Sequence, residues 1–142
     1  MPGTLPTDLH QHLLPEALIA ALARRSEAPR LARDGRGWRL ELAGEPASGF
    51  DPADHEPGAR SAIAERDGVR RVVVSLSSAL GIEALPIEEA GPLLAHFNDG
   101  ILELGGPFEL WGSTVGPDAA EPLLTSGARG LSLPRSRATW PR

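Results

Sequence analysis

The sequence has no cysteine, no tyrosine and no lysine, and aromatic residues make up only 4% of its 142 positions. The absence of cysteine excludes disulfide bonds and thiolate metal sites. With so few aromatic side chains, the core must be aliphatic, and a hydrophobic share of 41% is sufficient for one globular domain. All 14 Lys and Arg positions are arginine. Together with the abundance of Ala, Gly and Pro, this indicates the coding bias of a GC-rich genome.

Long apolar runs are also lacking, and no stretch approaches the roughly 20 residues that span a bilayer. The N-terminus has no basic segment followed by an apolar one, so a signal peptide is not expected. The net charge of −5 gives no reason to expect nucleic-acid binding. We therefore expect a cytoplasmic protein that binds neither nucleic acid nor membrane.

Strand patterns alternate with helix patterns along the chain. Strands are predicted at residues 5–12, 69–78, 108–115 and 130–133. Helices are predicted from 15 to about 26, at 57–67, at 86–104 and at 118–126. This order indicates parallel βαβ units, and the β-branched centre of 69–78 indicates a strand covered on both faces. The strand at 108–115, which contains Trp111, is also expected to be buried.

Two features interrupt the regular alternation. Asp34–Gly37 has turn chemistry, and Trp38–Leu42 alternates apolar with charged side chains. We expect a small β-hairpin flap at about 30–50, inserted after the first helix. Gly91-Pro92 lies inside the third helix and predicts a kink or two successive helices there. Residues 135–142 have no periodicity and are expected to form an irregular tail.

His10 and His12 are the residues that carry the clearest chemistry. Alternate residues of a strand share one face, so these two imidazoles, roughly 7 Å apart along the strand, could bind one metal ion. Asp8 falls on the same face by this rule. The pair lies at the C-terminal end of the first strand, where parallel α/β folds place their active sites. The alternative is a pair of surface or capping histidines in a loop.

Thr7–Pro15, which reads TDLHQHLLP, resembles the first-strand motif of the amidohydrolase superfamily. The closest resemblance is to the branch that contains aminocarboxymuconate-semialdehyde decarboxylase. Supporting segments within residues 5–134 are Asp34–Arg39, Asp51-Pro52 with Arg60, Gly68–Ser78, Ala95–Asp99, Phe108–Gly112 and Gly127–Gly130. The resemblance implies that residues 1–134 form the first four βα units of a (β/α)8 TIM barrel. A complete barrel needs about 250 residues, so the chain resembles a truncated or frame-shifted N-terminal half.

The same resemblance implies roles for individual residues. His10 and His12 would be metal ligands, usually for Zn²⁺. Asp8 could orient one of their rings, or it could be an ordinary strand-end aspartate. Arg39 matches a flap arginine that binds a substrate carboxylate in the decarboxylase branch, and the alternative is an exposed strand arginine in the environment of Glu41.

The family's remaining ligands, and with them its catalytic base, come from later strands that this sequence does not contain. The resemblance therefore implies a metal-dependent hydrolase of C–N or C–O bonds in a small-molecule substrate, with little or no activity in this chain alone. A non-oxidative decarboxylase is one alternative. The other is a non-catalytic remnant, or a half-barrel that needs a partner chain. A homo-oligomer or a complementing C-terminal half is the kind of association expected.

Three further polar positions are interpreted more simply. His55 is expected to be a solvated loop histidine, and His96 a partly exposed helical one. The serine cluster Ser75–Ser78 ends a predicted strand and could touch a substrate. Without a His–Asp partner pattern, no serine nucleophile is predicted.

Overall fold

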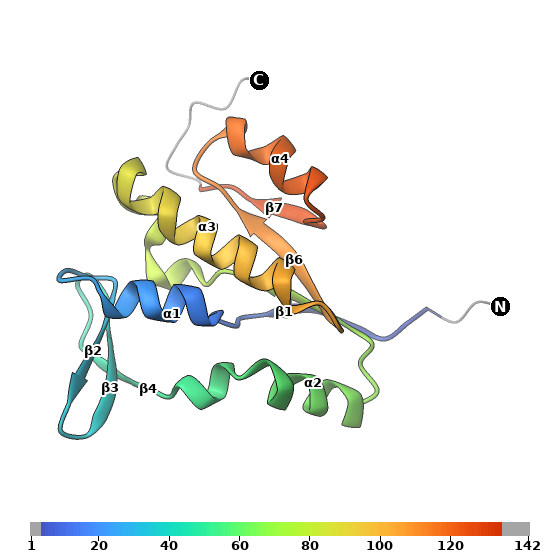
Figure 1. Cartoon of the computed structure of the whole chain (residues 1–142), viewed down its shortest axis with the longest axis horizontal. Coiled ribbons are helices and arrows are strands. Elements are labelled where there is room, and N and C mark those ends of the chain that lie inside the picture. Colours follow the sequence, from blue (N-terminus) through green and yellow to red (C-terminus); the bar gives the residue numbers. More distant parts are fainter. Residues whose placement is uncertain (1–3, 135–142) are drawn as a thin grey trace.

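The structure is a computed structural model, which describes residues 4–134 (Figure 1). It has a mixed α/β architecture, with a curled four-stranded parallel sheet and a separate three-stranded antiparallel sheet. The strands of the parallel sheet are, in spatial order, β1 (Thr7–Gln11), β5 (Arg71–Ser75), β6 (Phe108–Ser113) and β7 (Gly130–Ser132). The helices are α1 (Glu16–Ala23), α2 (Pro57–Arg66), α3 (Ile87–Leu104) and α4 (Ala120–Thr125). The predicted alternation of strands and helices is confirmed.

The core lies between the parallel sheet and the helices. Val72 and Val74 of β5 are almost fully buried, as are Leu110 of β6 and Phe97 of α3. α1 packs against α3, and α3 packs against β6. Val73, which points to the other side of β5, is also only 6% exposed, so the side chains on both sides of β5 are buried, although the helices cover only one face of the sheet. Trp111 is 40% exposed on β6, so the prediction of a wholly buried third strand is wrong.

The predicted flap is confirmed and is larger than a hairpin. β2 (Arg30–Asp34) and β3 (Gly37–Glu41) form the hairpin, and β4 (Ser48–Phe50) adds a third antiparallel strand. Gly37 follows the turn with a φ of 123°, a conformation that favours glycine. The third strand was missed because three residues are too few to show a period.

α3 is one uninterrupted helix, so of the two alternatives predicted at Gly91-Pro92, two successive helices are excluded and the kink stays a prediction. Pro92 lacks the N–H that would bond to the preceding turn, and it lies near the start of an 18-residue helix. The rest of the helix is held by an apolar stripe that faces the core. No helix within residues 4–134 is long and apolar enough to cross a membrane.

Gly100 of α3 marks the place where α3 and the start of α1 approach most closely. A Cβ atom on Gly100 would lie 2.5 Å from the Cβ of Pro15. We expect Gly100→Ala to lower the free energy of unfolding by about 1–3 kcal/mol, because overpacking outweighs the gain in helix propensity. Urea denaturation followed by circular dichroism measures the change.

Gly91→Ala is the matched control, because it places the same methyl group in the same helix where nothing lies within 4 Å. It should cost less than Gly100→Ala. Equal losses in the two variants would show that the contact with Pro15 is not the cause.

Candidate metal site at the end of β1

The pairing of β1 with β5 is irregular between Asp8 and Gln11, the interval that contains His10. Thr7 lies opposite Arg71 and Asp8 opposite Val72, but Gln11 lies opposite Val74. β1 therefore carries one residue more than β5 in this interval, which defines a β-bulge. Regular pairing would have placed His10 opposite Val74, whose side chain is buried in the core. The bulge instead turns His10 toward the open side of the sheet.

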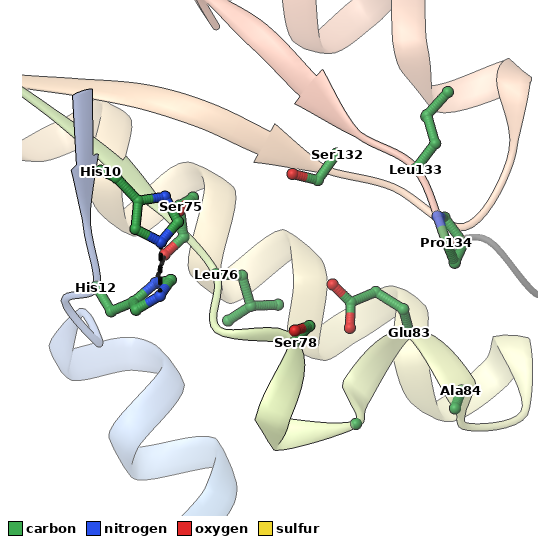
Figure 2. Close-up of a pocket in the computed structure, with 11 residues that line it drawn as sticks. His10, His12, Ser75, Leu76, Ser78, Glu83, Ala84, Ser132, Leu133 and Pro134 are labelled. Atoms are coloured by element: carbon green, nitrogen blue, oxygen red, sulfur yellow. Dashed lines mark hydrogen bonds between the residues drawn. The ribbon is translucent and has the colours of Figure 1, made fainter.

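The rings of His10, near the carboxyl end of β1, and of His12, just after the strand, converge on each other (Figure 2). Their Nε2 atoms are 3.1 Å apart, and the ring planes are 80° to each other. The Nδ1 atom of His12 lies 2.8 Å from the main-chain oxygen of Ser75, at the end of β5. Because a carbonyl oxygen only accepts, Nδ1 of neutral His12 carries the proton and its Nε2 is free to accept. His10 then donates through Nε2 in the metal-free state.

This geometry suits two ligands of one metal ion. In a tetrahedral zinc site with Zn–N bonds of 2.0–2.1 Å, two ligand nitrogens are about 3.3 Å apart. A second ring nitrogen bonded to a main-chain oxygen is also the usual arrangement of a metal-binding histidine. The set is incomplete, since residues 4–134 contain no group of three or more His, Asp or Glu side chains that could hold a metal. The donors present fit half of a zinc site.

A cavity of about 440 Å³ lies beside the histidine pair. Ser75 and Ser78 of the predicted serine cluster line it, together with Glu83 from a 3-10 turn and Ser132 from the end of β7 (Figure 2). β5 ends at Ser75, earlier than expected. Two 3-10 turns follow, because Gly81 between them adopts a φ of 68°. These turns form one wall of the cavity.

Asp8 does not lie on the face of the two imidazoles, so that prediction is wrong. Its carboxylate accepts hydrogen bonds from the Gln11 side chain at 2.8 Å and from the His10 main-chain N–H at 3.1 Å. The Gln11 bond, followed by the His10 bond, lowers the pKa of Asp8. The bulge is the physical reason, because it separates Asp8 from the face that His10 adopts. The partner of the His12 ring is the Ser75 carbonyl.

Arg39 lies on β3 of the flap. Its Nη2 donates to the Ala47 carbonyl at 2.7 Å, and its Nε is 3.9 Å from Asp34. Glu41 pairs with Arg30 at 2.6 Å instead. Arg39 is not among the described residues that line the cavity beside the histidines. Its assignment to substrate binding stays a prediction.

His55 is not a solvated loop residue, so that interpretation is wrong. Its Nδ1 accepts the Leu14 N–H at 3.0 Å, and its ring stacks on Phe50 of the flap at 5.0 Å. Burial, reinforced by the positive charge of Arg60, lowers the pKa of His55. His55 thus ties the segment after β1 to the flap. His96 is partly exposed on α3, as expected.

Arg60 of α2 also contacts the segment after β1. Its guanidinium donates to the Asp54 carbonyl at 2.8 Å, to the Gln11 side chain at 3.3 Å and to the His12 carbonyl at 3.4 Å. The resemblance singled out Arg60 without giving it a role. The contacts of Arg60 and His55 fix the main chain on both sides of Leu13, and with it the position of His12.

No protein-family model matches the sequence, and no curated protein matches it significantly.

Proposed function

We propose that the chain forms the first four βα units of a (β/α)8 barrel of the amidohydrolase type, in which His10 and His12 bind Zn²⁺ or another divalent metal. The observation that carries this proposal is the 3.1 Å approach of the two Nε2 atoms at the carboxyl end of β1. The curled parallel sheet, with its histidines at the carboxyl ends of the strands, supports it. The reaction class that follows is metal-dependent hydrolysis of a C–N or C–O bond.

The residues around the cavity have separate tasks in this proposal. The Ser75 carbonyl holds the His12 ring in the tautomer that leaves Nε2 free. A bound Zn²⁺ supplies a Lewis acid and lowers the pKa of a water molecule toward about 7. The cavity of about 440 Å³ has the size of a site for a small molecule. Ser78 and Glu83 offer polar contacts to a substrate that enters it.

Hydrolysis is favoured over decarboxylation by the charge of the cavity. A decarboxylase must hold a substrate carboxylate, for which an arginine is well suited. The described lining of the cavity contains no arginine and one carboxylate, that of Glu83. A catalytic zinc site has three protein ligands, so two histidines of one chain should support little or no turnover.

Titration of the purified, metal-free chain with Zn²⁺ tests the proposal. We expect saturable binding of micromolar or tighter affinity in isothermal titration calorimetry, because two preoriented imidazoles bind better than isolated surface histidines. Absence of saturable binding would refute the proposed function. Rapid turnover of amides or lactones by a zinc-loaded monomer would show that one chain holds a complete catalytic site, contrary to the proposal.

A further inference from the structure

The face of the parallel sheet that lies away from the helices is open and apolar. Within residues 4–134, four of the seven exposed large hydrophobic residues belong to this sheet or adjoin its edge strands: Leu5, Leu9, Trp111 and Leu133. Leu9 is 76% exposed. A hollow of about 510 Å³ extends over this face, with Leu9, Val73 and Trp111 in its lining. Clusters of this kind mark interaction surfaces.

Charged groups of the same hollow are already paired with one another. Glu109 lies 2.7 Å from Arg71 and 3.3 Å from Arg129, and these arginines lower its pKa. Arg71 and Glu109 stand near the amino ends of β5 and β6, whereas Ser75 and Ser132 stand at the carboxyl ends of β5 and β7. The open face therefore has an apolar middle between two polar ends, as the interior of a small barrel has.

Both edges of the sheet are also unpaired in the described part of the chain. β1 pairs with β5 alone, and β7 pairs with β6 alone. Exposed strand edges of this type tend to recruit further strands. All four strands are parallel, so the edge strand β7 of one copy can pair in parallel with the edge strand β1 of another copy.

We propose that a second copy of this chain covers the open face and closes an eight-stranded barrel with two-fold symmetry. The second copy is favoured over an unrelated partner because both complementary edges are present on this one chain. A two-fold axis along the barrel forms both β7–β1 junctions at once and leaves no edge. It also places the apolar middle of one sheet against that of the other. Four strands from each copy give the eight that a side-chain-filled barrel requires.

The dimer would complete the donor set at the metal site, and this part of the inference rests on the proposed function. In an eight-stranded ring, β1 of one copy lies opposite β1 of the other. The interior of such a barrel is just wide enough for side chains to fill, so side chains from opposite strands meet. His10 and His12 of both copies would then face one another at one barrel mouth. Four imidazoles exceed the three protein ligands of a catalytic zinc site.

Light scattering after gel filtration tests the association, with Leu9→Lys as the variant. We expect the wild-type chain to have twice the mass of its 15.0 kDa protomer. Leu9→Lys should be monomeric with an unchanged circular dichroism spectrum, because the exposed Leu9 side chain contributes little to the fold of one copy. Leu124→Lys is the matched control, since Leu124 is 49% exposed on α4 and lies outside the open face. It should remain dimeric.

A monomeric wild-type chain, or a dimer that survives Leu9→Lys, would overturn the inference. Zinc stoichiometry separates it from the proposed function, because a shared site predicts one Zn²⁺ for two chains. A dimer that binds no zinc would support closure of the barrel and refute the proposed function. Zinc binding by a monomeric wild-type chain would support the proposed function and refute closure of the barrel.

Discussion

Replacing His10 and His12 together with alanine is expected to weaken Zn²⁺ binding by more than about 100-fold, or about 2.8 kcal/mol. Loss of a mere hydrogen-bond partner of a metal ligand costs about 10–100-fold, so loss of two ligands must cost more. Calorimetric titration of the wild type and the double variant measures the change. The fold should persist, since His10 is exposed and His12 only half-buried.

The matched control is His96→Ala, which removes a partly exposed imidazole from α3 and leaves the histidine pair in place. It should bind Zn²⁺ as the wild type does. Equal zinc content in the wild type and the double variant would refute the metal site. Equal losses in the double variant and in His96→Ala would indicate non-specific binding to surface histidines.

The position of the histidine pair could be predicted from the sequence because strand patterns are local. The orientation of His10 could not be. Strict alternation predicted that Asp8 and His10 share a face, but the bulge depends on how β1 pairs with β5, some 60 residues later in the chain. A pairing register is a long-range property, and the sequence of β1 alone carries no sign of it.

Contacts made by the main chain were equally hidden from the sequence. The partner that orients His12 is the carbonyl of Ser75, and any residue at that position would present the same oxygen. His55 was interpreted as solvated because Asp54 and Glu56 flank it. The His55 ring instead points inward, where its Nδ1 accepts the Leu14 N–H, a main-chain donor that needs an acceptor. Charged neighbours in the sequence do not decide the direction of a side chain in a 3-10 turn.

Replacing Asn98 with alanine is expected to lower the free energy of unfolding by about 2–5 kcal/mol. Asn98 of α3 is 4% exposed and makes two hydrogen bonds to the main chain of Ser113 at the end of β6. Its Nδ2 donates to the Ser113 carbonyl at 2.9 Å, and its Oδ1 accepts the Ser113 N–H at 3.0 Å. Each buried polar group left without a partner costs about 1–3 kcal/mol. Urea denaturation measures the loss.

Two further variants separate hydrogen bonding from packing. Asn98→Leu keeps the number and branching of the side-chain heavy atoms and removes both bonds, so it should be at least as destabilising as Asn98→Ala. Recovery of stability in the leucine variant would show that a cavity is the cause instead. Asp99→Ala, at the exposed next position, should change the free energy of unfolding by less than about 0.5 kcal/mol. Typical domains are stable by only about 5–15 kcal/mol, so the Asn98–Ser113 pair would contribute a large share of the free energy that holds α3 on the sheet. Because Ser113 ends β6, the same pair also holds the strand ends that surround the cavity in place.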